Sequence, residues 1–163
     1  MSFFRIATYV ILIVLLILAS VIFRSRPQYL GEIDHLSVQN DTEVLFDSFG
    51  IPHIYGQTKQ DAYRALGYVH AQDRLFQMEL LRRAGGGRLS EVFGPDLIEV
   101  DKLFRTLGVH RKAEYEAERA RNESSQAVLE CAEAYLEGVN TYVDEGRSPM
   151  EFMIAGIPKE HFT

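Results

Sequence analysis

The stretch from Gly67 to Gly94 most constrains how this chain can fold, because it predicts a helix that is apolar on nearly every side. Such a helix is normally enclosed by other protein. Asp73 falls within its first apolar stripe, and a buried carboxylate is costly unless a cation and hydrogen-bond donors meet it. We therefore expect Asp73 to be buried and paired with an arginine or with backbone donors outside its own helical turn. Arg88 and Arg105 are the candidate arginines, and Arg105 is preferred. The stripe comprises Ala62, Ala65, Leu66, Val69, Phe76 and Leu80, and the face behind it Tyr68, Ala71, Leu75 and Met78.

The N-terminal segment carries a second apolar run, Ile6 to Phe23, with Arg5 before it and Arg24 and Arg26 after it. At about 1.5 Å per residue this run forms a helix of about 27 Å, near the hydrocarbon thickness of a bilayer. It is longer than the core of a signal peptide, about 7–15 residues, and its small-residue cleavage signal is poor. Residues 1–26 are therefore interpreted as an uncleaved signal anchor, with a cleaved signal peptide and a buried core helix as alternatives. The flanking arginines do not settle the membrane orientation.

The remaining 137 residues are acidic: without the three arginines of the N-terminal segment, 14 basic residues stand against 23 acidic ones, a net charge of −9. Such a surface repels nucleic acid, and no basic stripe with interleaved aromatics occurs. Cys131 is the only cysteine, which excludes an internal disulfide and makes a cysteine-based metal cluster implausible. Because Cys131 shares a helical stripe with Val128, Tyr135 and Val139, we interpret it as a small core residue.

The segment after residue 27 reads as two short strands followed by helices, an α+β pattern that is mostly helical with a short β-hairpin. The strands are expected at Glu43–Phe46 and His53–Tyr55. Thr58 to Asp61 resembles a capping box that opens the long helix, and Gly85 to Gly87 should end it.

Two further helices are expected. One begins near Asp96, after a short turn from Leu89 to Phe93, and continues beyond Arg111 as a charged, solvated tract. The other runs from about Ser125 to Glu145 and ends at Gly146.

Several residues have both a chemical and a structural interpretation. Gly85 to Gly87 could cradle a phosphate, but it follows a helix rather than a strand, which favours a helix cap. His70 and Asp73 are spaced as metal ligands, yet no third ligand is evident. His53 beside Pro52 is interpreted as a packing and hydrogen-bonding residue.

An acid–base site could be built from Asp73, Arg74, Glu79, Arg82 and Arg83. Glu79 has arginines three and four residues later, the spacing of helix ion pairs, so a structural salt-bridge network is favoured.

The order of short motifs resembles the penicillin acylase (penicillin amidase) family, over roughly residues 30 to 158. The resemblance is to the N-terminal part of the precursor, which gives rise to the α subunit. The matching elements are Asp47, Gly50-Ile51-Pro52-His53-Ile54, Asp61-Ala62, Gly67-Tyr68, Ala71-Gln72-Asp73-Arg74, Gln77-Met78, Arg82-Arg83, Gly87-Arg88-Leu89-Ser90-Glu91, Gly94, Asp101, Arg105 and Gly108.

The resemblance implies a partial N-terminal nucleophile hydrolase of αββα fold, with residues 27–163 as a truncated α-subunit region. It implies hydrolysis of carbon–nitrogen bonds in small linear amides, and export to the periplasm or anchoring in the inner membrane through Ile6 to Phe23. In this family a serine exposed at the start of the β subunit attacks the amide, its own α-amino group acts as base, and backbone and Asn donors stabilise the oxyanion. The partner would be the missing β-subunit region, and calcium is possible in the full-length protein.

No residue of this segment is assigned a catalytic, cofactor-binding or metal-binding role. The family's nucleophilic serine is followed by Asn and, shortly after, Trp, and this sequence contains no Trp. The family's calcium-binding acid is not assigned to Glu151. The segment alone is therefore expected to be inactive. The alternative is a non-catalytic, membrane-anchored helical interaction module.

Overall fold

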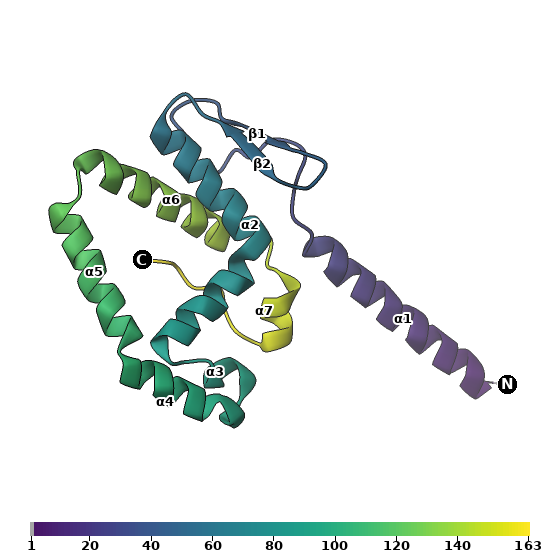
Figure 1. Cartoon of the computed structure of the whole chain (residues 1–163). Helices are drawn as coiled ribbons and strands as arrows, with labels where there is room; N and C mark the ends of the chain where they lie inside the picture. The colour runs from purple at the N-terminus through teal and green to yellow at the C-terminus, as the bar shows by residue number, and fades with distance from the viewer. Residues whose placement is uncertain (1) are drawn as a thin grey trace.

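One long helix, α2, organises the structure, and the other elements pack along it or extend from it (Figure 1). The computed structural model describes residues 2–163, with side chains from Ile6 onward. In chain order the elements are α1 (Ser2–Arg24), β1 (Glu43–Phe46), β2 (Pro52–Tyr55), α2 (Lys59–Gly86), α3 (Ser90–Phe93), the 3₁₀ helix η1 (Pro95–Leu97), α4 (Ile98–Leu107), α5 (Val109–Glu123), α6 (Gln126–Glu145) and α7 (Met150–Ala155). The described chain is mostly helical with one hairpin, as the sequence predicts.

Local signals set the ends of α2. The Thr58 hydroxyl accepts a hydrogen bond from the Asp61 amide at 3.0 Å, which satisfies an amide of the first turn. At the other end Gly87 adopts a left-handed conformation (φ 62°), and its amide closes the last turn. Both predicted boundaries of the long helix are confirmed.

Helices α2 and α6 pack backbone to backbone where Gly67 faces Gly138. A Cβ atom at Gly67 would overlap the carbonyl of Tyr135, and one at Gly138 would overlap the carbonyl of Arg64. Only glycine permits this approach, which brings the neighbouring side chains of the two helices into contact.

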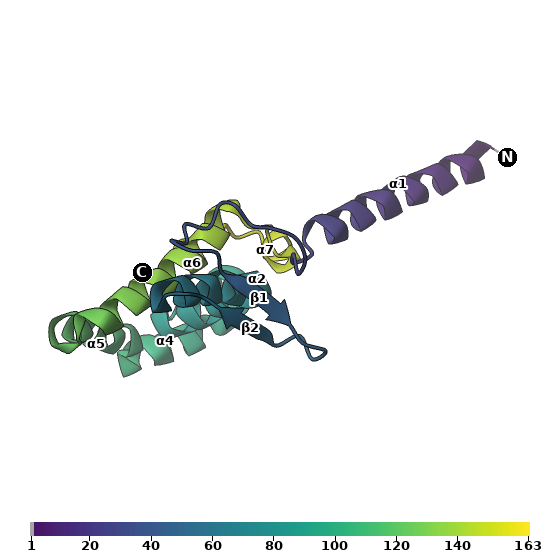
Figure 2. The same cartoon turned by 90° about the horizontal axis from the view of Figure 1, so that it is seen from above.

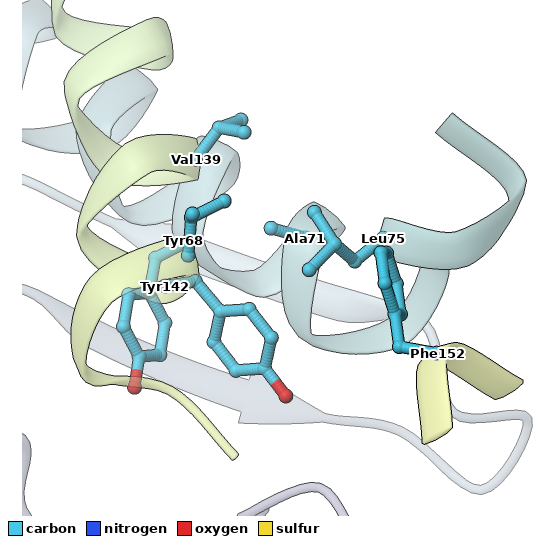
Figure 3. Packing of buried hydrophobic residues seen from close by; sticks show 7 residues of the cluster. Tyr68, Ala71, Leu75, Val139, Tyr142 and Phe152 are labelled. Carbon is cyan, nitrogen blue, oxygen red and sulfur yellow. The ribbon is translucent and has the colours of Figure 1, made fainter. Parts of the chain in front are cut away.

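The core lies along this crossing (Figure 3). The rings of Tyr68 and Tyr142 meet edge to face with their centroids 5.3 Å apart. The Tyr142 hydroxyl donates to the Arg147 carbonyl at 2.7 Å, and burial raises the pKa of Tyr142 to about 12. The buried cluster is Tyr68, Ala71, Leu75, Val139, Tyr142, Val143 and Phe152.

The hairpin has the expected strands, with β2 beginning at Pro52. Its antiparallel register runs from Glu43 opposite Tyr55 to Phe46 opposite Pro52. The Asp47 carboxylate accepts hydrogen bonds from the amides of Phe49 (2.8 Å) and Ile51 (2.9 Å) across the turn. These bonds explain why Asp precedes the turn.

The predictions for the later helices need three corrections. The helix expected from Asp96 through the charged tract is divided at Gly108, whose left-handed conformation (φ 67°) ends α4 and begins α5. Cys131 is half-buried and Val128 is 58% exposed, so this part of the α6 stripe is not a packed core. Helix α7 was not predicted, whereas α6 has the predicted limits.

Helix α1 extends away from the remaining elements (Figures 1 and 2). Its apolar stretch, Ile6–Arg24, has the length and composition of a membrane span, and none of it is buried against the protein. Within this chain the segment is therefore exposed, and the alternative of a buried core helix finds no support. Residues 25–42, which we call the strap, run back from α1 across α2 to the hairpin.

We predict that Gly67→Ala and Gly138→Ala each destabilise the fold by about 1–3 kcal/mol, because the added methyl group forces the helices apart. Urea unfolding of the full chain in detergent micelles, followed by near-ultraviolet circular dichroism, measures this loss. Gly85→Ala is the matched control within α2: its methyl group would meet only a Val109 side chain at 3.7 Å. Equal stability of Gly67→Ala and Gly85→Ala would contradict the role of the crossing.

Candidate functional site

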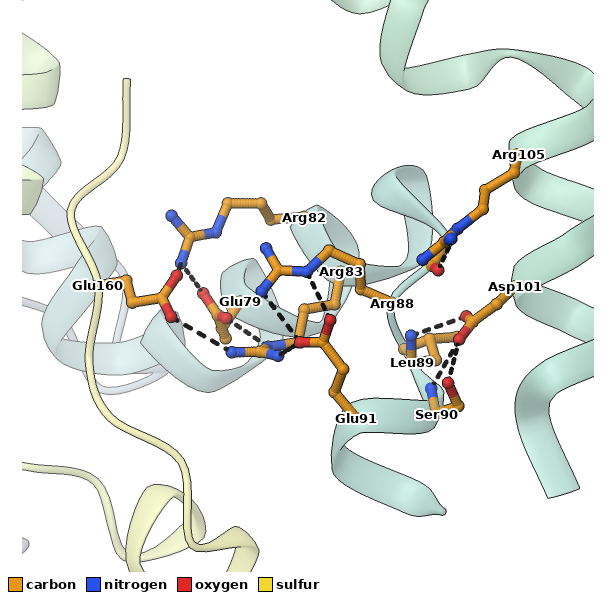
Figure 4. A network of polar contacts seen from close by, with 11 residues as sticks. Glu79, Arg82, Arg83, Arg88, Leu89, Ser90, Glu91, Asp101, Arg105 and Glu160 are labelled. Atoms are coloured by element: carbon orange, nitrogen blue, oxygen red, sulfur yellow. Dashed lines mark hydrogen bonds and ion pairs between the residues drawn. The ribbon is translucent and has the colours of Figure 1, made fainter. Parts of the chain in front are cut away.

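Buried charge concentrates near the C-terminal end of α2 (Figure 4). Glu79 and Arg83 are only 1% and 3% exposed, and Arg83 Nε donates to Glu79 Oε1 at 2.5 Å. Arg82 also donates to Glu79. The predicted pairing of Glu79 with the arginines three and four residues later is thus confirmed.

These pairs extend into a wider arginine–glutamate network. Arg83 reaches Glu91 of α3 at 2.5 Å, and Arg82 reaches Glu160 near the C-terminus at 3.1 Å. Arg88 also donates two hydrogen bonds to Glu91, each 2.9 Å long. Chiefly through the Arg88 hydrogen bond, the pKa of Glu91 lies below its usual value, so its carboxylate stays ionised. The network joins the end of α2 to the neighbouring α3 and to the distant C-terminal segment.

A second buried acid, Asp101 of α4, holds the turn after α2. Its carboxylate accepts hydrogen bonds from the Leu89 amide (2.7 Å), the Ser90 amide (2.9 Å) and the Ser90 hydroxyl (2.6 Å). Burial alone would raise the pKa of Asp101, but these bonds and the charge of Arg105 outweigh it and lower the pKa. Arg105 itself donates to the Gly87 carbonyl at 2.9 Å and so caps α2.

A third buried acid, Asp61, fastens the strap to the start of α2. It is fully enclosed and accepts from the Gln39 amide at 2.8 Å and the Asn40 side chain at 3.1 Å. Burial raises its pKa, and these hydrogen bonds, with that of Thr58, outweigh burial, so the pKa is lowered. The sequence predicted Asp61 only as part of a capping box and did not predict its contacts with the strap or the role of Asp101. Both acids stand among apolar helix positions, and this was the available signal.

The prediction for Asp73 is wrong. Asp73 is exposed and accepts a hydrogen bond from the Tyr29 hydroxyl at 3.1 Å, while Arg88 and Arg105 lie in the contacts described above. The buried face of α2 instead follows a spacing of three and four residues that passes beside Asp73. Its members are Asp61, Ala65, Tyr68, Gln72, Leu75, Glu79 and Arg83.

The other candidate residues lie apart from one another. His70 forms a 2.6 Å hydrogen bond with the Tyr135 hydroxyl, which supports a structural role rather than a shared metal with Asp73. His53 lies 3.5 Å from Asp47 at the hairpin, and Arg74 donates to Gln77. Within the described residues, no three His, Cys, Asp or Glu side chains gather as a metal-binding group.

One hollow of about 660 Å³ is open to solvent beside the C-terminal end of α1. We call it the foot hollow. It is lined by the last turn of α1, the start of the strap, the hairpin turn, residues 72–77 of α2 and the start of α7. Its polar members include Arg26, Asp73, Arg74, Gln77 and Glu151.

We predict that Glu79→Gln destabilises the chain by about 3–5 kcal/mol, because it leaves the buried Arg83 without its charge partner. Denaturant unfolding measures the loss. Glu99→Gln is the control, since Glu99 pairs with Lys102 on the exposed surface of α4 and such pairs contribute about 0–1 kcal/mol. A similar small effect for both variants would contradict a structural role for the network.

The lowered pKa values of Asp61 and Asp101 predict acid sensitivity. A carboxyl group with a folded-state pKa below its ordinary 3.8 stabilises the fold at higher pH. That stabilisation is lost as the pH falls through the folded-state pKa. Asp101→Asn should be less stable than the wild type at pH 7 and lose less stability between pH 5 and pH 2. Parallel pH profiles of unfolding free energy would contradict this linkage.

Comparison with known proteins identifies the family of this chain. Residues 41–163 match the family model described as penicillin amidase. The chain is 38% identical over 135 residues to the penicillin acylase 2 proenzyme of Pseudomonas sp. (strain SE83), covering 82% of this chain and 17% of the relative. It is 38% identical over 124 residues to the acyl-homoserine lactone acylase QuiP of Pseudomonas aeruginosa, covering 75% and 14% respectively. Penicillin G acylase of Escherichia coli is 33% identical over 138 residues, covering 83% of this chain and 15% of that enzyme.

A solved structure agrees with these sequence matches. The thermostable penicillin G acylase from Alcaligenes faecalis superposes with a TM-score of 0.63 at 28% identity, covering 76% of this chain and 66% of that one. The chain spans less than a fifth of the length of these three curated relatives. It belongs to the penicillin amidase family and corresponds to the N-terminal part of the family's precursors.

Proposed function

We propose that this chain is the N-terminal segment of an amide hydrolase that cleaves the carbon–nitrogen bond of small linear amides. The observation that carries the proposal is the family match over residues 41–163. The relatives include a penicillin acylase and an acyl-homoserine lactone acylase. Both names describe enzymes that act on an acyl group. The shared chemistry is removal of an acyl group from an amine.

The nucleophile, in this proposal, lies in the β-subunit region and not in this segment. Each of the five histidines contacts a tyrosine or an acid, and no described contact joins a histidine to a serine or threonine hydroxyl. A base-activated serine of the Ser-His type is therefore not assembled by the described residues. The N-terminal serine of the β subunit would attack the amide carbonyl, with its own α-amino group as base. Calcium, if the mature enzyme holds it, belongs to the full-length protein.

The β-subunit region would cover apolar surface that this segment leaves exposed. On the outward face of α2, Tyr63, Leu66 and Leu81 are 44%, 39% and 74% exposed, and Phe49 at the hairpin turn is 88% exposed. Large exposed apolar patches mark interaction surfaces in soluble proteins. Helix α2 is thus enclosed on one face by α6, and its opposite face is available to the partner region.

Residues 1–26, in the same proposal, form a signal anchor, and residues 27–163 form the partial α-subunit region. The span Ile6–Arg24 is apolar enough to cross a membrane and is exposed along its length. Export of the following domain would place the hydrolase in the periplasm, anchored at the inner membrane or released by cleavage.

The test compares this chain with the same chain continued by its downstream reading frame. We expect no hydrolysis of phenylacetyl or fatty-acyl amides above background by the chain alone. The continued product should be cut into two subunits, release the amine, and lose activity when the first serine of the β subunit is replaced by alanine.

Two outcomes would overturn the proposal. One is a downstream frame without a processing site followed by Ser-Asn. The other is turnover by the purified chain alone that disappears when a serine or threonine within it is replaced. Ser124→Ala and Thr106→Ala are the controls and should leave any such turnover unchanged. The Thr106 hydroxyl bonds only to the Lys102 carbonyl of its own helix, and Ser124 is the residue at which α5 ends.

A further inference from the structure

The foot hollow lies where α1 joins the folded domain. In Figure 1 the C-terminal end of α1 lies near α7 and the hairpin, and Figure 2 shows the same end beside α7. The hollow is lined by Ile22 in the last turn of α1 and by Ser25 and Arg26 directly after it. If α1 spans a bilayer, which is part of the proposed function, a site bounded by its last turn lies at the depth of the lipid headgroups.

The strap fixes the domain at this depth. The Gln28 amide donates to the Gln72 side chain at 3.2 Å, and the Tyr29 hydroxyl donates to Asp73 at 3.1 Å. Arg147 donates to the Arg26 carbonyl at 3.2 Å. Only Ser25 to Pro27 separate the end of α1 from the first of the strap's contacts with α2. The domain therefore cannot move far from the membrane surface, and the hollow stays beside the headgroups.

The hollow presents charges of both signs. Arg26 and Arg74 bring guanidinium groups from the strap and from α2, and Asp73 and Glu151 bring carboxylates from α2 and α7. No ion pair joins Arg26, Arg74 or Glu151 to another described residue, and the Arg26 guanidinium stacks 4.9 Å from the Phe23 ring centroid. Guanidinium groups bind phosphate, and carboxylates accept hydrogen bonds from an ammonium group.

Apolar side chains complete the lining. Ile22, Phe76 and Met150 border the hollow beside these charges. Such a combination suits a ligand with a charged head and an apolar remainder.

We propose that the foot hollow binds the headgroup of a zwitterionic phospholipid with a primary ammonium, the phosphatidylethanolamine class. Its phosphate lies against Arg26 and Arg74, and its ammonium lies against Glu151 and Asp73. The bound lipid orients the domain on the membrane, with the hairpin turn and the start of α7 toward the bilayer.

The experiment uses the full chain, made by cell-free synthesis into vesicles of equal parts phosphatidylethanolamine, phosphatidylcholine and phosphatidylglycerol. Lipids retained after mild detergent extraction are identified by native mass spectrometry. We expect phosphatidylethanolamine to be retained above the other two lipids. Arg74→Gln and Glu151→Gln should each lower its retention about fivefold, the effect of one charged group near a membrane surface.

Two controls match these variants. Arg119→Gln and Glu123→Gln neutralise the same charge types at an exposed ion pair of α5, away from the hollow, and should leave retention unchanged. Near-ultraviolet circular dichroism checks that each variant remains folded.

The outcomes separate the lipid site from the proposed anchoring. In a Cys131→Ser background, Leu15→Cys should resist a membrane-impermeant maleimide if α1 spans the bilayer, and its labelling would refute the anchoring and with it the lipid site. If Leu15→Cys is protected but all three lipids are retained equally, the lipid site is refuted while the anchoring stands. Preferential retention of phosphatidylglycerol that depends on Arg74 but not on Glu151 would show a plain anion site and also overturn the proposal. None of these readouts depends on amide hydrolysis, so the proposed activity is tested separately.

Discussion

The approach of α2 to α6 at Gly67 and Gly138 is the contact on which the rest of the fold depends. Because neither residue has a side chain at this point, the two backbones touch. The flanking residues Tyr68, Val139 and Tyr142 then pack directly against the partner helix. Tyr68, Ala71 and Leu75, three and four residues apart along α2, join the same buried cluster as Val139 and Tyr142 of α6.

Buried carboxylates of α2 and α4 hold the neighbouring segments in place. Asp61 binds the strap, Glu79 anchors the arginines that reach α3 and the C-terminal segment, and Asp101 holds the turn after α2. Asp61 and Asp101 accept hydrogen bonds from backbone amides of connecting segments, whereas Glu79 binds Arg82 and Arg83 of its own helix, which in turn reach Glu160 and Glu91. Hydrogen bonds and opposite charges offset the cost of removing these carboxylates from water. The polar network is therefore part of the scaffold of this family segment, and its charges need no catalytic explanation.

The two ends of the domain have different surroundings. The α1 end carries the foot hollow and the strap, with unpaired charges of both signs. The outward face of α2 carries exposed apolar residues such as Leu66 and Leu81. The buried acids Asp61, Glu79 and Asp101 and the buried Arg83 are, in contrast, all engaged in internal contacts. This division is consistent with a chain that spans less than a fifth of the length of its three curated relatives named above.

The sequence by itself determined the elements whose signals are local. The Thr58 cap, the Gly87 stop, the hairpin around Gly50 and the limits of α6 follow from short-range hydrogen bonding and backbone conformation, which neighbouring residues specify. The order of short motifs likewise identified the family. Only the tertiary structure decided which carboxylate of α2 is buried. On a helix that is apolar on nearly every side, periodicity gives the angle of each residue but not the side from which a partner helix approaches. In the folded chain Glu79 is 1% exposed while Asp73 lies at the surface. The contacts around α2, such as Gly67 with the Tyr135 carbonyl and Arg82 with Glu160, join residues about 70 to 80 positions apart, and no local pattern connects such residues.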